Sequence, residues 1–157
     1  MVSPDQFRQV MGNFATGVTV VTTRTVNGMP YGLTVSAFTS VSLNPVLVLV
    51  CLDNRLSGLQ HFRESKHFGV SILGEHQEDL SRIHAKKDSE RPETIYFSGA
   101  LGIPLLRSSI AVLECETVKI YEGGDHQIFL GEVQNAEVLH SHSPLMYFRG
   151  KYQRLMV

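Results

Sequence analysis

Residues 32–45 carry an unusual pattern of side chains for a β-strand. With a period of two, the odd positions from Leu33 to Leu43 are mostly apolar and indicate a core face. The even positions hold four small hydroxyl residues and one aromatic residue, all uncharged: Thr34, Ser36, Phe38, Ser40 and Ser42. Small hydroxyl side chains donate hydrogen bonds and leave the backbone approachable. The pattern is typical of a strand that lies along a flat ligand with polar edges. An ordinary Ser/Thr-rich strand that faces water fits it equally well.

A second group of polar side chains follows an apolar run. Val46–Leu52 is apolar on both faces, which predicts a strand buried on both sides, as in a closed or covered barrel. Asp53, Asn54 and Arg55 come directly after it. Asn54 is suited to cap a helix, and a helix N-terminus beside an arginine is a reasonable site for an anion. Simple capping is the favoured interpretation of these residues from the sequence alone.

Two later segments combine residues suited to contact a nucleotide. Glu122–His126 contains two glycines and an aspartate, which favour a tight turn with His126 at the mouth of a hairpin. A lone histidine in a turn is more often solvated than functional. Leu145–Tyr152 mixes aromatic residues with two cations around a glycine. It fits a terminal edge strand with snorkelling basic side chains. It also fits a grip on a dinucleotide, with aromatic faces for stacking and cations for phosphate.

The rest of the chain offers little acid–base chemistry. The other six histidines are predicted to be surface residues: His61, His67, His76, His84, His140 and His142. The sequence has no nucleophile elbow in a Ser-His-Asp order, no metal-ligand spacing, no Walker loop and no Rossmann glycine fingerprint. An enzyme with so few such groups needs a cofactor to carry its reaction. Hydride transfer fits, because the protein then has mainly to hold two flat rings in register and exclude water.

The elements that must position these residues are mostly strands. Short β-branched runs alternate with turn signals such as Asn27-Gly28 and predict a predominantly antiparallel β-barrel. Apolar residues at helical spacing predict peripheral helices over Pro4–Phe14, Arg55–Ser65 and roughly His76–Lys87, with boundaries good to about three residues. The fold class is therefore mainly β with helices at its periphery.

Composition excludes several classes of protein. The 157 residues fit a single domain spanning 1–157. With 14 basic and 15 acidic residues there is no electrostatic case for binding nucleic acid or an anionic membrane surface. No apolar run approaches a membrane span, and the N-terminus lacks the pattern of a signal peptide. Cys51 and Cys115 are predicted to be buried free thiols in a reducing cytosol, so we expect a cytoplasmic protein without a metal site.

The chain resembles the flavin reductase-like, FMN-binding split-barrel family. Five runs carry the resemblance over essentially the whole chain, in the right order and with similar spacing: Ala15–Thr23, Gly32–Phe38, Ser40–Pro45, Gly124–His126 and Phe148–Tyr152. Within that family the chain is most similar to the small reductase component of two-component flavin-dependent aromatic monooxygenases. The resemblance implies a split β-barrel homodimer with flavin near the subunit interface.

The activity that the resemblance implies is that of an NAD(P)H:flavin oxidoreductase. Hydride would pass from NADH or NADPH to FMN or FAD, and a transient oxygenase partner would receive the reduced flavin. The alternative is a non-enzymatic flavin-binding or electron-carrier protein on the same barrel. A pyridoxamine-phosphate-oxidase-like or haem-binding split barrel is a second alternative.

The family's functional residues map onto matching positions of this chain. The backbone of Thr34, Val35, Ser36 and Ala37 would line the isoalloxazine. Ser40 and Val41 would lie near the ribityl–phosphate part, and Asp53, Asn54 and Arg55 at the phosphate end. His126, the catalytic candidate, would face the nicotinamide nucleotide together with Phe148, Arg149, Gly150 and Lys151. Ala85 lies in a His84-Ala85-Lys86 step where many relatives carry an aromatic residue, alanine and glycine. This step would border the phosphate or adenine edge of the pocket, and the choice between FMN and FAD stays open.

Overall fold

The computed structural model of the protein describes residues 1–87 and 89–156. The described helices are α1 (Pro4–Met11), α2 (Leu59–Ser65), α3 (Glu78–Ala85) and the short 3-10 helices η1 (Glu75–Gln77) and η2 (Glu93–Ile95). The strands are β1 (Thr16–Gly17), β2 (Thr19–Arg24), β3 (Pro30–Val35), β4 (Phe38–Leu43), β5 (Val46–Asp53), β6 (His67–Ile72), β7 (Tyr96–Ser98), β8 (Pro104–Leu106), β9 (Ala111–Gly123), β10 (His126–Val138), β11 (Leu145–Phe148) and β12 (Lys151–Arg154).

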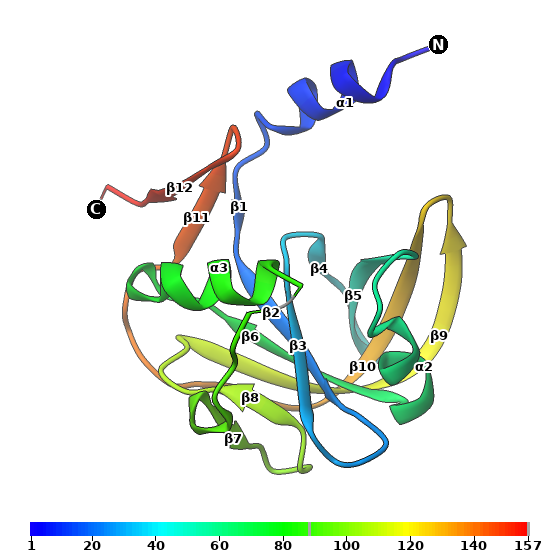
Figure 1. Ribbon diagram of the computed structural model, residues 1–157, viewed down its shortest axis with the longest axis vertical. Helices are drawn as coiled ribbons and strands as arrows, with labels where there is room; N and C mark the ends of the chain where they lie inside the picture. Colours follow the sequence, from blue (N-terminus) through cyan, green and yellow to red (C-terminus); the bar gives the residue numbers. More distant parts are fainter. Residues whose placement is uncertain (88, 157) are drawn as a thin grey trace.

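The main sheet has seven antiparallel strands in the order β3-β2-β6-β9-β10-β5-β4. Its edge strands β3 and β4 are consecutive in the chain and are joined only by Ser36 and Ala37. The sheet therefore curls round until its two edges approach each other at that connection (Figure 1). Among the described residues no ladder pairs β3 with β4, so the barrel is split. The predicted mainly β fold with peripheral helices is confirmed.

The remaining elements lie around this barrel. β11 and β12 form a hairpin that pairs with β1, and β7 pairs with β8. Helix α3 packs against β3, whereas α1 projects away from the body of the molecule (Figure 1). None of the residues of α1 is buried. In the part of the chain that the structure describes, no helix has the length and apolarity needed to cross a membrane.

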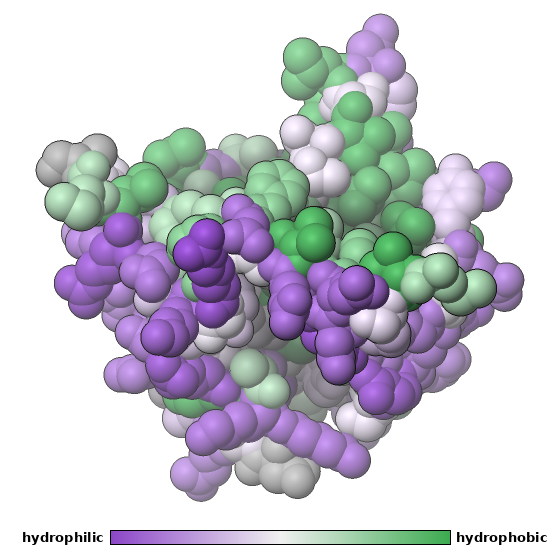
Figure 2. Space-filling view, turned by 90° about the horizontal axis from the view of Figure 1, so that it is seen from above, coloured by the Kyte–Doolittle hydropathy of each residue, from purple (hydrophilic) through white to green (hydrophobic). Residues whose placement is uncertain are grey.

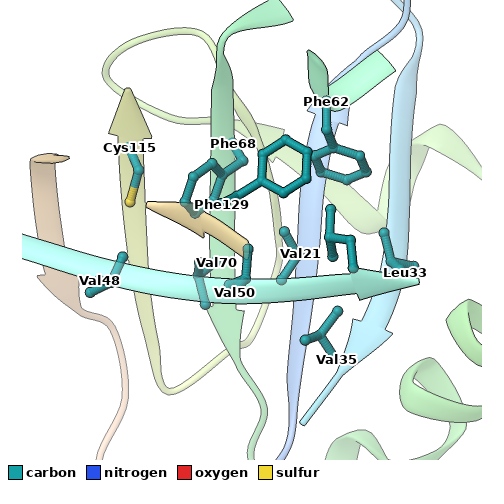
Figure 3. Close-up of a cluster of buried hydrophobic side chains, with 11 residues drawn as sticks. Val21, Leu33, Val35, Val48, Val50, Phe62, Phe68, Val70, Cys115 and Phe129 are labelled. Atoms are coloured by element: carbon teal, nitrogen blue, oxygen red, sulfur yellow. The ribbon is translucent and has the colours of Figure 1, made fainter. Parts of the chain in front are cut away.

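The core fills the inside of the curled sheet (Figure 3). Phe62 of α2 enters this core, with its ring centroid 5.9 Å from that of Tyr31 and 6.4 Å from that of Phe129. Both pairs are edge-on, an arrangement that aromatic quadrupoles favour. A second cluster around Val20, Leu73 and Tyr96 packs beneath α3. The two clusters hold the strands that carry the site described below.

Residues 32–45 form two strands rather than the single strand that their alternation predicts. The odd positions face the core only in the first half, where Leu33 and Val35 are buried. Ala37 lies in the connection and is exposed. Beyond it the chain runs along the outer edge of the sheet, where Leu43 is 91% exposed. The break is needed because the chain passes here from one edge of the sheet to the other.

Two further predictions need correction. α1 and α3 lie within three residues of their predicted bounds, but α2 begins at Leu59, four residues after the predicted start. The residue before it is Gly58, whereas the side chain of Asn54 donates to the carbonyl of Gly124 at 3.2 Å, so Asn54 does not cap this helix. β5 is also not buried on both faces. Val48, Val50 and Leu52 are buried, whereas the alternate residues are half-buried because their face borders a cavity.

Candidate functional site

A cavity of about 640 Å³ lies between α1, the β3–β4 connection, β5 and the β11–β12 turn. Much of its wall is apolar or aromatic: Met11, Phe14, Ala37, Phe38, Leu49 and Tyr147. Ser36, Thr39 and the half-buried Cys51 add small polar groups, and Arg8 and Arg149 supply positive charge. Burial raises the pKa of the Cys51 thiol, which favours its neutral form. The described lining residues include no carboxylate and no imidazole.

Arg149 fixes the β11–β12 turn against the end of α1. Its φ of 50° and that of Gly150, 76°, are both positive, as in the tight turns that match the twist of a hairpin. A positive φ is unfavourable for arginine, and two contacts with the residues that follow α1 offset it. The Arg149 amide donates to the carbonyl of Gly12 at 2.9 Å, and its Nε donates to Oδ1 of Asn13 at 2.9 Å. The otherwise projecting helix is thereby held at the rim of the cavity.

Two smaller cavities beneath α3 border the main cavity. One, of about 240 Å³, shares Ser36 and Tyr147 with it and is also lined by Thr34, Ala85 and Tyr152. The other, of about 490 Å³, is lined by three basic residues: Arg82, Lys86 and Lys151. The Thr34 hydroxyl donates to the carbonyl of Ser81 at 2.6 Å, and the Ser81 hydroxyl lies 2.6 Å from that of Tyr152. These bonds join β3, α3 and β12 into one polar floor.

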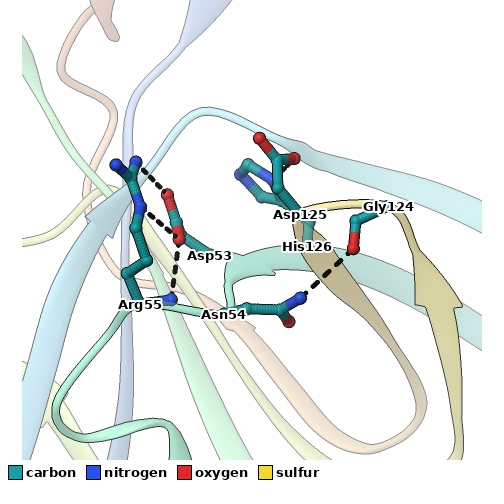
Figure 4. Close-up of polar contacts among 6 residues, drawn as sticks. All are labelled: Asp53, Asn54, Arg55, Gly124, Asp125 and His126. Atoms are coloured by element: carbon teal, nitrogen blue, oxygen red, sulfur yellow. Dashed lines mark hydrogen bonds and ion pairs between the residues drawn. The ribbon is translucent and has the colours of Figure 1, made fainter.

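A separate polar cluster forms where the β9–β10 turn meets the end of β5 (Figure 4). The Arg55 guanidinium donates through Nε and Nη2 to the two carboxylate oxygens of Asp53, at 3.1 and 2.8 Å. This contact holds the pKa of Asp53 well below its usual range, so Asp53 is ionised and largely neutralises Arg55. The backbone amide of Asn54 donates to the carbonyl of Asp125 at 2.9 Å. Nδ1 of His126 lies 2.7 Å from Oδ1 of Asp125.

The structure brings together only part of the predicted site. The predicted residues that line these three neighbouring cavities are Thr34, Ser36, Ala37, Ala85, Arg149, Gly150 and Lys151. The Phe148 ring lies 4.8 Å from the Arg149 guanidinium. The Val35 side chain points into the core, and its carbonyl accepts from the Thr19 hydroxyl at 2.6 Å. Ser40 and Val41 are exposed on the edge strand β4. Within one chain, His126 and the Asp53–Arg55 segment form the separate cluster at the β9–β10 turn.

Several residues of the main cavity were missed by reasoning from sequence. Met11 ends α1 and Phe14 follows it, and Phe38, Leu49 and Cys51 come from the two strands after the β3–β4 connection. The apolar stripe of α1 was visible as a helical pattern, but its spacing does not indicate which surface it borders. The apolar second face of β5 was a usable signal, because a strand with two apolar faces borders either protein or an apolar ligand.

His84 is the one histidine whose predicted surface position is plainly wrong. It is buried, with Nδ1 2.7 Å from the carbonyl of Leu80 and Nε2 2.6 Å from the hydroxyl of Tyr96. A carbonyl only accepts, so Nδ1 carries the proton and Nε2 accepts from Tyr96. Burial lowers the pKa of His84 to about 4 and raises that of Tyr96 to about 12, so both groups are neutral near pH 7. His84 therefore supports the wall behind Ala85 as an uncharged residue.

This arrangement suits binding and orientation better than proton transfer. The main cavity offers apolar faces, small hydroxyl groups and a strand connection with small side chains, which together fit a flat ring with a polar edge. Cations stand at its rim and in the adjoining cavity, where anionic ends of ligands would lie. The chemistry that it supports is transfer between two bound ligands held in register.

Known proteins resemble this chain in both sequence and fold. Residues 11–156 match the family described as flavin reductase like domain. The reductase component of 4-nitrophenol 4-monooxygenase/4-nitrocatechol 2-monooxygenase from Rhodococcus opacus is 39% identical over 147 residues, which cover 94% of this chain and 78% of that protein. An NADH-dependent FAD reductase from Streptomyces globisporus is 39% identical over 158 residues, covering 95% of this chain and 84% of that protein.

Solved structures agree with these relatives. Flavin reductase PheA2 in its native state has a TM-score of 0.92 at 37% identity, and the match covers 99% of this chain and 100% of that one. The NADH:FAD oxidoreductase SgcE6 of Streptomyces globisporus C-1027, solved with NAD and FAD fragments, has a TM-score of 0.91 at 38% identity, with 99% and 96% covered. The chain, with its split β-barrel, therefore belongs to the flavin reductase-like domain family.

Proposed function

We propose that the protein is an NADH-dependent flavin reductase that passes a hydride from NADH to FMN or FAD and supplies the reduced flavin to a partner monooxygenase. The observation that carries this proposal is the main cavity, which pairs apolar walls with a polar edge and has no carboxylate or imidazole among its described lining residues. Such a wall fits the faces and the heteroatom edge of an isoalloxazine. The relatives act as reductases for flavin or FAD, several as components of monooxygenases.

The chain's own residues then have three tasks. Phe14, Phe38 and Leu49 exclude water from the ring faces. Ser36 and Ala37, with their small side chains, let the backbone approach the ring edge. Arg149 and Lys151 hold anionic groups of the nucleotides at the rim. Flavin, when bound, supplies the two-electron acceptor, and the protein supplies orientation.

An anaerobic assay tests the function directly. Purified protein mixed with NADH and FMN or FAD should bleach the visible absorbance of the flavin and oxidise NADH with the same stoichiometry. Protein without flavin serves as the control. A flavin-binding carrier protein would instead bind flavin and leave NADH unchanged, and that result would overturn the proposed activity.

We also infer that the active form is a homodimer in the cytoplasm. The apolar side chains of α1 and of Phe14 just after it contact little within their own chain, with Phe7 59%, Val10 67% and Phe14 69% exposed. Figure 2 shows hydrophobic side chains gathered around the projecting helix. The edge strand β4 is also exposed and carries Val41 and Leu43. A second copy would cover both surfaces and close the open side of the main cavity. Two free cysteines support a reducing compartment.

Val10→Asp should weaken this dimer. Burying a charge in place of a valine removes apolar area from both copies, so the dimer dissociation constant should rise by at least about tenfold. Light scattering across a concentration series measures the change. Gln9→Asp places the same charge on the opposite face of α1 and should leave the dimer intact. A wild-type particle of 17.5 kDa at working concentration would contradict the dimer.

His126 is proposed to position the nicotinamide rather than to supply a proton. Its ring is held by Asp125, and within one chain it lies apart from the main cavity, so the second copy would have to bring it to the site. His126→Asn keeps a donor and should retain much of the activity, whereas His126→Ala should lose about tenfold in kcat/KM.

The pH profile separates the two roles of His126. For a positioning role, wild type and His126→Asn should have the same rate profile between about pH 5 and 8. If wild type shows a pH-dependent fall in rate that is absent from both His126 variants, His126 supplies a proton instead. Wild-type kinetics in both variants would remove His126 from the site.

A further inference from the structure

The side-chain amide of Asn13 is fixed on both sides. Its Nδ2 donates to the carbonyl of Gln9, in the last turn of α1, at 2.8 Å, and its Oδ1 accepts from Nε of Arg149 at 2.9 Å. The backbone amide of Arg149 adds a bond to the carbonyl of Gly12 at 2.9 Å. Figure 1 shows the β11–β12 turn beside the chain that follows α1. Asn13 therefore ties the side chain of Arg149 to the end of this helix.

This contact leaves one edge of the Arg149 guanidinium open. Its Nε is taken by Asn13, and the centroid of the Phe148 ring lies 4.8 Å from its Cζ. Within residues 1–87 and 89–156, Nη1 and Nη2 of Arg149 have no hydrogen-bond or ion-pair partner. A guanidinium edge with two parallel N–H donors fits a phosphate in bidentate fashion. Because Arg149 lines the main cavity, this edge is available to an anionic group of a bound ligand.

Asn13 holds Arg149 without cancelling its charge. The other cation that lines the main cavity is Arg8, and its Nη1 lies 2.8 Å from a carboxylate oxygen of Asp5. An amide oxygen accepts the same kind of hydrogen bond as a carboxylate but carries no net charge. Of these two cations, Arg149 is therefore the one whose charge has no acidic partner in the part of the chain that the structure describes.

We propose that Asn13 is a positioning residue for the nicotinamide nucleotide: it holds Arg149 so that the Nη1–Nη2 edge, with its charge uncompensated, receives a phosphate group of NADH. The inference rests on the proposed function, in which Arg149 binds an anionic group of a nucleotide at the rim. An arginine that is already held loses less side-chain entropy on binding than a free one. A phosphate contact is made equally before and during hydride transfer. The contact with Asn13 should therefore lower KM for NADH and leave kcat nearly unchanged.

Steady-state kinetics at saturating flavin test this proposal. Asn13→Ala frees the Arg149 side chain and should raise KM for NADH by about fivefold or more, with kcat changed by less than about twofold. Asn13→Asp keeps an acceptor for Nε but offsets the charge of Arg149, so it should also raise KM by about fivefold or more. Calorimetric titration of NAD⁺ into protein loaded with oxidised flavin should show the same loss of affinity without turnover. Gln9→Ala is the matched control, because it removes an exposed amide side chain one turn earlier that has no hydrogen-bond partner among the described residues.

A double-mutant cycle separates positioning from a purely structural role of Asn13. Arg149→Ala removes the residue through which Asn13 acts, so adding Asn13→Ala to it should raise KM by less than about twofold more. All variants are assayed at a concentration at which light scattering gives them the mass of wild type. An effect of Asn13→Ala that is equally large with and without Arg149 would refute the inference, because Asn13 would then act on the fold.

The same measurements distinguish this inference from the proposed function. Wild-type protein that oxidises NADH in the presence of flavin, together with Asn13 variants that keep its KM, would refute the inference and leave the proposed function intact. Wild-type protein that binds flavin and does not oxidise NADH would refute the proposed function itself.

Discussion

Glu114→Ala should destabilise the fold by on the order of 3–5 kcal/mol, a large share of the roughly 5–15 kcal/mol that stabilises a typical domain. Glu114 lies on β9 and is fully buried. Its Oε1 accepts from the amides of Leu101 and Ile103, at 2.9 and 3.4 Å, and its Oε2 accepts from the side chain of Asn135 at 2.9 Å. The substitution leaves one buried amide and two part-buried donors without their partner and adds a cavity.

The conservative variant separates hydrogen bonding from volume. In Glu114→Gln the amide oxygen still accepts from Leu101 and Ile103, and the amide nitrogen donates to Asn135 once that side chain turns its oxygen inward. Its cost should therefore be clearly smaller than that of Glu114→Ala. Urea unfolding at one fixed protein concentration measures both. Glu116→Ala, two residues along the same strand and exposed, is the control. A loss below about 1 kcal/mol in Glu114→Ala would show that water replaces the carboxylate.

Local signals predicted the elements whose ends are fixed by neighbouring residues. Ser3 and Gln6 form a capping box at the predicted start of α1, with hydrogen bonds of 3.1 and 3.2 Å. Asn27-Gly28 makes the predicted turn between β2 and β3, with Gly28 at a φ of 81°. In both places the residues that determine the local backbone geometry lie within three positions of one another. The sequence of that short segment is therefore enough to predict the structure.

Long-range contacts decided the features that the sequence analysis missed. α2 starts directly after Gly58, which packs against the ring of Tyr31 from a distant strand. The break between β3 and β4 has no glycine or proline to mark it and follows from the curling of the whole sheet. The α1 stripe borders a cavity and a free surface instead of a core. The resemblance grouped His126 with the residues after Tyr147, but one chain alone holds them in separate clusters.

The stability of the protein should also fall on mild acidification because of His84. Its side chain is buried between Leu80 and Tyr96, and the charge of Arg91 opposes a second positive charge beside it. The pKa of His84 is about 4 in the folded protein, against an ordinary value of 6.5. Above pH 6.5 both folded and unfolded chains hold His84 neutral, and its contribution to stability is complete. Below that pH His84 binds a proton in the unfolded chain but stays neutral in the folded chain, so the free energy of unfolding falls.

The expected result is a free energy of unfolding that depends on pH only between two pH limits. The free energy of unfolding should fall by up to about 1.4 kcal/mol per pH unit from pH 6.5 and should level off near pH 4, where the folded protein is protonated too. Urea unfolding of wild type, His84→Gln and His67→Gln at one protein concentration measures the slope. His84→Gln removes the titrating ring, so it should lose this part of the slope, whatever its stability at pH 7. His67 is exposed, and His67→Gln should keep the wild-type slope. Equal slopes in wild type and His84→Gln would mean that the folded protein accommodates a charged His84, and the buried neutral pair with Tyr96 would then not hold in solution.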